Sequence, residues 1–141
     1  MKVDQLSAEI EKQLKAYHAD VTEVMNETTK KVAKKTVKKL KETSPKGKQA
    51  RTKTKRGKKR RPYHETWKSS EEYNPMGNSA VVYNDQNYRL THLLENGHVV
   101  IAPDGVAHDR TAPKPHIKPA EEAAIEEYLK ETVKGIENVS K

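Results

Sequence analysis

Apolar residues in the first third of the chain recur mostly at steps of three and four positions, with charged residues between them. This spacing predicts one amphipathic helix. Residues 3–41 contain neither Gly nor Pro, and the helix should stop before Pro45, because the residue ahead of a proline resists the α region. Unbroken, the helix would be about 60 Å long, so it either bends near residues 26–29 or projects onto a neighbour. The apolar stripe consists of Leu6, Ile10, Leu14, Tyr17, Val21, Val24, Thr28, Val32, Val37 and Leu40.

After Pro62 the pattern changes to period two, which is typical of β-strands. Trp67, Ser69, Glu71 and Tyr73 alternate along one side of a first strand, PMGN turns, and SAVVY forms a second strand. The order HVVIA, PDG and GVAH predicts a further short hairpin. Together these segments indicate a small antiparallel sheet of three or four strands.

Two further helices complete the predicted order. Residues 87–95 form a short helix with Leu90, Leu93 and Leu94 around its polar face, and Gly97 ends it as a left-handed cap. A terminal helix begins at about Pro119, where two acids suit a helix N-terminus. The fold class is therefore α+β: a long N-terminal helix, a small antiparallel sheet with a short helix, and a C-terminal helix, in one domain spanning residues 1–141. The apolar stripe of the terminal helix is Ile125, Leu129, Val133 and Ile136.

Composition limits both the core and the chemistry. Only 33% of the 141 residues are hydrophobic and Phe is absent, so the core must be small and help from partner subunits would be useful. The absence of Cys excludes disulfides, thiolate metal sites and cysteine nucleophiles. No apolar run approaches the roughly 20 residues of a membrane helix, and the N-terminus lacks a signal-peptide core, so we expect a soluble protein made in the cytoplasm, with no membrane partner.

Charge is distributed unevenly along the chain. Residues 30–61 carry 17 Lys and Arg against one acid, Glu42, whereas the remainder has 11 basic and 19 acidic residues. Residues 45–62 hold ten of these basic residues and no large apolar side chain, which predicts a mobile loop and contact with phosphates that is non-specific and salt-sensitive. A solvated loop with no partner is the alternative. The candidate residues for contact with nucleic acid or a channel lumen are Lys46, Lys48, Arg51, Lys53, Lys55, Arg56, Lys58, Lys59, Arg60 and Arg61.

His92, Glu95 and His98 stand at even three-residue intervals and could be taken for a metal-ligand set. Zinc-protease helices need His residues at i and i+4 beside a Glu, in one of two orders, and neither order occurs here. Gly97 also places His98 beyond the helix. We therefore expect no metal site, and that His92 and Glu95 share a hydrogen bond or face a subunit interface. No catalytic motif and no cofactor-binding motif is found, which favours a protein that is not an enzyme.

The succession of a long N-terminal helix, ETSPKGK, YHETWK, VVYND, YRLTHLLENGH and PHIKPAEEA before a final helix resembles the small head-tail joining, or neck, proteins of long-tailed bacteriophages. These proteins are also labelled minor capsid or tail-completion proteins. The resemblance covers nearly the whole chain, and YRLTHLLENGH and PHIKPAEEA are its most specific parts. The matching stretch of the family is enlarged here by the basic insert, and Lys46-Gly47 stands where Thr-Gly is expected. The motif residues, with structural or interface roles, are Tyr88, His92, Leu93, Glu95, Gly97, His98, Pro115, His116 and Pro119.

The resemblance implies a non-enzymatic homo-oligomeric ring at the virion neck, assembled in the bacterial host cytoplasm. It also implies that Leu90, Leu93 and Leu94 seat the short helix on the sheet. Such a ring joins connector to tail, with the neighbouring connector and tail-terminator rings as partners and double-stranded DNA passing through its centre. A small basic protein that binds DNA without sequence preference is the alternative, because it explains the basic segment equally well. A metal-dependent hydrolase would explain only the histidines.

Overall fold

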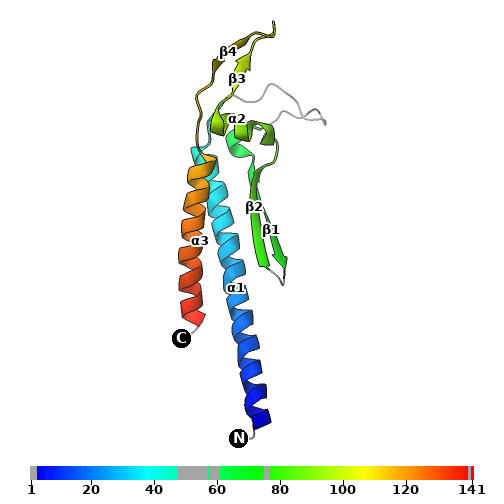
Figure 1. Cartoon of the computed structure of the whole chain (residues 1–141), viewed down its shortest axis with the longest axis vertical. Helices are drawn as coiled ribbons and strands as arrows, with labels where there is room; N and C mark the ends of the chain where they lie inside the picture. Colours follow the sequence, from blue (N-terminus) through cyan, green and yellow to red (C-terminus); the bar gives the residue numbers. More distant parts are fainter. Residues whose placement is uncertain (1–2, 48–56, 58–60, 75–76, 140) are drawn as a thin grey trace.

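The computed structural model describes residues 3–47, 57, 61–74, 77–139 and 141. Helices and strands both occur in the described part of the chain, with a long first helix and a long last helix, which confirms the predicted α+β class (Figure 1). In chain order the elements are α1 (Val3–Thr43), η1 (Tyr63–Glu65), β1 (Trp67–Asn74), β2 (Gly77–Asn84), η2 (Tyr88–Leu90), α2 (Thr91–Asn96), β3 (Val99–Ile101), β4 (Ala107–Arg110) and α3 (Ile117–Val139).

Helix α1 is continuous over 41 residues and ends just before Ser44 and Pro45, as the sequence predicts. Its last turn is closed by Ser44, whose N–H donates to the carbonyl of Leu40 at 2.9 Å. Helix α1 projects beyond the rest of the subunit, as one of the two expectations had it, while its contact with a neighbour stays a prediction. Helix α3 and the β1–β2 hairpin lie along the C-terminal half of α1, while the N-terminal half extends beyond both of them (Figure 1).

The strands form two separate hairpins. β1 and β2 pair antiparallel from Trp67 opposite Asn84 to Asn74 opposite Gly77. β3 and β4 also pair antiparallel, but they belong to a different two-stranded sheet. The expectation of one sheet of three or four strands was therefore wrong. The reason is that α2 and the positive φ of Gly97 lie between β2 and β3 and direct the second hairpin away from the first (Figure 1).

The core is small and lies where α1, α3 and the start of β1 meet. Its buried cluster contains Leu40, Tyr63, Trp67 and Ala120. Leu94 packs against this cluster and seats α2, as expected, whereas Leu90 is exposed and does not have the predicted seating role. The partly buried residues around the cluster are Val37, Val82, Leu94 and Ile117.

Helix α3 packs on α1 through small residues and ion pairs. A Cβ built on Gly135 would lie 2.3 Å from a methyl carbon of Val24, so the helices approach closely there. Lys31 pairs with Glu131 and Lys35 pairs with Glu127 across the same interface. The predicted apolar stripe of α3 does not face α1, because Ile125, Leu129 and Val133 are 55–59% exposed. Periodicity identified an apolar face, but the close approach of the helices selects the face with small residues.

Candidate functional site

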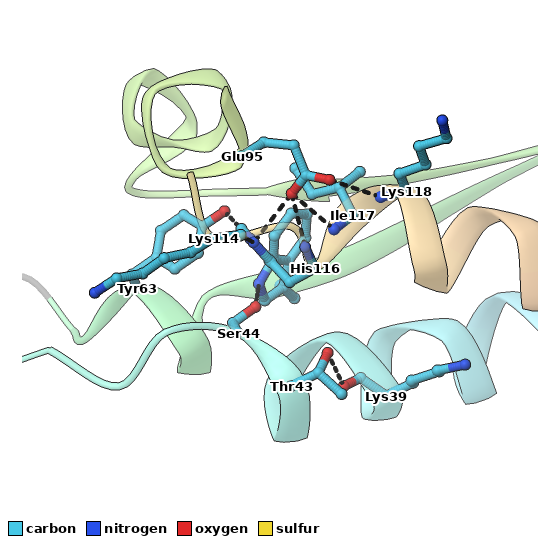
Figure 2. Close-up of polar contacts among 10 residues, drawn as sticks. Lys39, Thr43, Ser44, Tyr63, Glu95, Lys114, His116, Ile117 and Lys118 are labelled. Carbon is cyan, nitrogen blue, oxygen red and sulfur yellow. Dashed lines mark hydrogen bonds and ion pairs between the residues drawn. The ribbon is translucent and has the colours of Figure 1, made fainter. Parts of the chain in front are cut away.

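The two most specific motifs of the sequence meet at the N-terminal end of α3 (Figure 2). YRLTHLLENGH forms η2, α2 and the turn into β3, while PHIKPAEEA forms the start of α3. The N–H of Lys114 donates to the carbonyl of Leu94 at 2.7 Å and ties the two segments together. We call the cluster of Ser44, Tyr63, Trp67, Glu95 and His116 the motif junction.

Glu95 caps the N-terminus of α3. Its Oε2 accepts hydrogen bonds from the N–H groups of His116 at 2.8 Å and Ile117 at 2.9 Å, and its Oε1 accepts from the N–H of Lys118 at 2.9 Å (Figure 2). The first N–H groups of a helix have no partner within the helix and carry partial positive charge, so a carboxylate satisfies both needs. Both carboxylate oxygens are therefore engaged by the backbone of α3.

His116 is 3% exposed and links Glu95 to the core. Its Nδ1 lies 2.7 Å from the carbonyl oxygen of Lys114 and 3.1 Å from Oε2 of Glu95, while its Nε2 lies 2.8 Å from the Tyr63 hydroxyl. Because a carbonyl oxygen only accepts, Nδ1 carries a proton, and in the neutral ring Nε2 accepts from the Tyr63 hydroxyl. Burial raises the pKa of Tyr63, and the Glu95 charge raises it further, which keeps this hydroxyl a donor.

Trp67 closes the junction from the side of β1. Its indole N–H donates to the Ser44 hydroxyl at 2.8 Å, and Ser44 follows directly after α1. The rings of Trp67 and Tyr63 meet edge to face at 5.7 Å between centroids, and those of Trp67 and His116 at 6.2 Å. Edge-to-face pairs are a favoured aromatic geometry. The end of α1, the start of β1 and the start of α3 are therefore joined by three rings.

A second buried polar network was not predicted from the sequence. The Asn84 side-chain oxygen accepts from the Thr66 hydroxyl and from the N–H of Asn87, both at 2.8 Å. The amide groups of Asn84 and Asn87 donate to the carbonyls of Tyr63 and Arg61 at 2.9 and 3.1 Å. These bonds fix the chain on both sides of β1–β2. The signal available in the sequence was the turn at 84–87, which the structure confirms.

The three residues that suggested a metal set have different surroundings. Glu95 is the cap described above, and the Nδ1 of His98 lies 3.1 Å from the hydroxyl of Thr111. His92 is exposed on α2. Within residues 3–47, 57, 61–74, 77–139 and 141, no three His, Cys, Asp or Glu side chains gather in a way that could hold a metal ion.

The other motif residues lie around the junction. Tyr88 is exposed and carries the Arg89 guanidinium 5.8 Å from its ring centroid, while Leu93 is half-buried. Pro115 precedes α3, and Pro119 is its third residue, so the predicted start of this helix was two residues late. A proline is tolerated there because N–H groups of the first turn have no partner within the helix. Gly97 is buried and has a φ of 70°.

Most of the basic candidates lie outside the described residues. Within them, Lys46 is exposed and Arg61 places its Nε 3.8 Å from the Glu65 carboxylate. The predicted contact of this segment with DNA stays a prediction. The candidates beyond the described residues are Lys48, Arg51, Lys53, Lys55, Arg56, Lys58, Lys59 and Arg60.

A family profile described as "Bacteriophage HK97-gp10, putative tail-component" matches residues 8–97, which is more than half of the chain. The chain belongs to the HK97-gp10-like family. No curated protein matches the chain, and neither does any solved structure.

The HK97-gp10-like match extends from α1 through the β1–β2 hairpin to α2 and ends at Gly97. It therefore contains Glu95 but not the helix that Glu95 caps. Membership makes this protein a bacteriophage tail component with a structural role in the virion. In the described part of this tail component, none of the helices combines the length and the apolar character needed to span a bilayer.

Replacing Glu95 with Gln is expected to lower the free energy of unfolding by about 1–2 kcal/mol at neutral pH, as for loss of a helix cap. This loss of stability in Glu95→Gln should become smaller as the pH is lowered. Burial by itself would raise the pKa of Glu95, but the three N–H donors of Ile117, Lys118 and His116, together with the His116 ring, outweigh burial and lower it. A carboxyl with a lowered folded-state pKa stabilises above its unfolded value of 4.5, and this stabilisation is lost as pH falls through the folded-state pKa.

Urea denaturation between neutral pH and about pH 3 measures this effect, with Glu126→Gln as the matched control on the exposed face of α3. The control should leave both the stability and its pH dependence close to those of the wild type. An equal loss in Glu126→Gln, or an unchanged acid profile in Glu95→Gln, would show that Glu95 is not the cap.

Proposed function

We propose that this tail component is a non-enzymatic part of the phage head-tail junction. It forms a homo-oligomeric ring around the DNA channel and joins the connector to the tail, with the neighbouring connector and tail-terminator rings as partners. Its location is the virion neck, and its assembly takes place in the host cytoplasm. Membership of a phage tail-component family supports a structural role, and the shape of the subunit supports a role in an assembly.

The observation that carries this proposal is the uncovered N-terminal half of α1. Its apolar residues Leu6, Ile10, Leu14 and Tyr17 are 44–63% exposed, although they continue the stripe that is buried further along the same helix. An isolated helix of this length is only marginally stable in water, and most helical stability comes from packing an apolar face. A subunit with this shape is completed by neighbours, as a ring provides.

The charge distribution supports a channel with DNA at its centre. Outside residues 30–61 the chain has 11 basic and 19 acidic residues, whereas residues 45–62 alone hold ten positive charges and no acid. An acidic body avoids binding DNA along its whole surface, while one basic segment in each subunit of a ring contacts the passing duplex weakly and repeatedly. Weak contact suits transit, because a tight grip would obstruct the DNA.

Deletion of the gene in its phage tests the proposed role. We expect DNA-filled heads and separate tails that do not join, and recovery of joined particles when the protein is supplied from a plasmid. Electron microscopy of particles that carry a tagged copy should place the tag at the neck. Joined, infectious particles without the protein, or a tag elsewhere in the virion, would contradict the proposal.

The density of positive charge also supports a second candidate, a small DNA-binding protein without sequence preference. That function requires tight binding of duplex DNA by the isolated monomer or dimer at physiological salt. The neck function requires weak binding by the monomer and stronger binding after oligomerisation. Fluorescence anisotropy with a short duplex, measured over protein concentration and salt, separates the two.

Neutralising the basic segment tests its contact with DNA. In a variant with Gln or Ser at seven positions, the slope of log K against log salt should fall in magnitude by up to about 6, if all seven side chains contact phosphates. Folding should be unchanged, because a segment without large apolar side chains contributes little to a core. A variant with Lys130→Gln and Lys134→Gln is the control and should bind as the wild type does. The seven positions are Lys53, Lys55, Arg56, Lys58, Lys59, Arg60 and Arg61.

Three outcomes of this experiment have distinct meanings. A folded variant that assembles but retains DNA poorly in particles agrees with the prediction. Failure to fold would show that the segment is structural. A variant that folds and forms rings, but fails to join the neighbouring ring, would show that the segment docks on an acidic protein surface.

A further inference from the structure

The uncovered stripe of α1 lies on the same face of the helix that α3 covers further along. Ile10, Tyr17, Val24 and Lys31 are spaced by seven residues, so they lie close to one line along the helix. Helix α3 contacts this line at Val24, through Gly135, and at Lys31, through Glu131. Helix α1 extends beyond the end of α3 (Figure 1). On this line Tyr17 and Ile10 are 44% and 50% exposed. One half of this apolar face therefore packs against α3, and within the described chain the other half, at Ile10 and Tyr17, is uncovered.

The same chain carries an apolar groove that could receive such a stripe. The groove has a volume of about 380 Å³ and is floored by residues 29–36 of α1. Val82 of β2 lies on one wall, and Ile125 and Leu129 of α3 lie on the other. Ile125 and Leu129 are 55% and 59% exposed, so the predicted apolar stripe of α3 borders the groove without a partner.

Charge indicates which partner fits the uncovered stripe. Residues 3–24 of α1 contain five acids and two lysines, whereas residues 25–43 contain two acids and seven lysines. The described groove lining contains one charged side chain, Glu121 of α3, and the lysines adjoin the floor residues of α1 in sequence at positions 30, 31, 34 and 35. Among the described residues, Lys30 and Lys34 make no ion pair. An acidic arm is repelled by DNA and by an anionic membrane surface, but it is attracted to the basic half of a second α1.

We propose that residues 3–24 of α1 form an arm that docks its apolar stripe into the groove between α1, β2 and α3 of a second copy of this chain. The contact is head to tail, because the arm and the groove are different surfaces of one subunit. Repetition of a head-to-tail contact gives a closed ring or an open filament. The inference deepens the proposed function by naming the contact that would build the ring, and it rests on that function only for closure of the ring.

Cysteine cross-linking of the full chain tests this contact directly, because the natural chain contains no Cys. A variant with Ile10→Cys and Leu129→Cys should give a ladder of disulfide-linked multimers on oxidation, while each single-Cys variant stays unlinked. The two positions cannot link within one chain. Ile10 is 21 residues from Lys31, which pairs with Glu131, and this separation is about 30 Å along the helix. A variant with Lys12→Cys and Leu129→Cys is the matched control, because Lys12 lies on the opposite face of α1.

Removal of the stripe provides a second measurement. A variant with Leu6→Gln, Ile10→Gln and Leu14→Gln should keep the core, since these side chains are exposed in the subunit. Its self-association, measured by sedimentation, should weaken by about a hundredfold or more. Circular dichroism and urea denaturation verify that the core still unfolds as in the wild type.

Four results would overturn the arm-in-groove contact. They are a wild-type protein that stays monomeric at all accessible concentrations, no ladder from the Ile10 and Leu129 pair, an equal ladder from the Lys12 control, and wild-type assembly of the stripe variant. The proposed function can fail separately. A ladder from a protein whose deletion leaves heads and tails joined would keep this contact and remove the neck function. If instead the heads and tails join only when the protein is present, but the cysteine pair gives no ladder, the neck function stands and the arm-in-groove contact is removed.

Discussion

Replacing Trp67 with alanine should lower the free energy of unfolding by about 3–5 kcal/mol. Trp67 is 3% exposed and sits in a cluster that also contains Leu40, Tyr63 and Ala120. The truncation removes the largest side chain of this cluster. It also leaves the hydroxyl of Ser44, a residue that is 2% exposed, without its indole partner. Domains of this size have only about 5–15 kcal/mol of stability, so the loss is a large share.

The matched control is Tyr73→Ala on the same strand, since Tyr73 is 45% exposed and lies outside the cluster. It should cost less than about 1 kcal/mol. Urea denaturation followed by circular dichroism suits both variants, because Trp67 is the only tryptophan and its fluorescence is lost with it. If Trp67→Ala were no more costly than Tyr73→Ala, the cluster would not be the core of this domain.

The elements of the fold could be predicted because their signals are local. The spacing of Leu6, Ile10 and Leu14 predicted α1, and Pro45 predicted its end within two residues of the observed Thr43. Period-two alternation from Trp67 onward predicted β1, with its inward side half-buried at Ser69 and Glu71. Each of these signals depends only on residues that are near one another in the chain.

The arrangement of the elements was harder to predict, because it depends on contacts between distant segments. Periodicity placed Ile125 and Leu129 on the apolar stripe of α3, yet α3 meets α1 through Ala120 and Gly135. Small residues carry little hydrophobic signal, but they allow two helix backbones to approach closely. The division into two hairpins was missed for a related reason, since turn residues mark where strands end and not which strands pair.

In the motif junction, too, the residues could be identified from local sequence but their contacts could not. The sequence singled out Glu95 and His116 as motif residues, but no local rule connects Glu95 with the N–H of Ile117, 22 residues further on. Capping signals in a sequence are sought within three residues of a helix start. A cap supplied by another helix is therefore visible only in the folded chain, and the same holds for the bond from Tyr63 to His116.

Replacing Gly97 with alanine should lower the free energy of unfolding by about 2–5 kcal/mol. Its φ of 70° and ψ of 165° lie in a region that is essentially reserved for glycine, which corrects the expected left-handed helical cap. The chain needs this conformation because it passes directly from α2 into β3. A Cβ at this position would also lie 2.3 Å from the backbone oxygen of Thr111, so backbone must move to admit it.

Gly105→Ala separates these two causes. Gly105 has a φ of 81°, but a Cβ built there has nothing within 4 Å, so this variant bears only the conformational strain of about 1–2 kcal/mol. Urea denaturation should rank Gly97→Ala well above Gly105→Ala. Gly97→Ala should also weaken the pairing of His98 with Thr111, which hydrogen exchange of the Thr111 N–H would report. Equal costs for the two variants would show that the contact with Thr111 relaxes freely, and that Gly97 is required for its backbone angles alone.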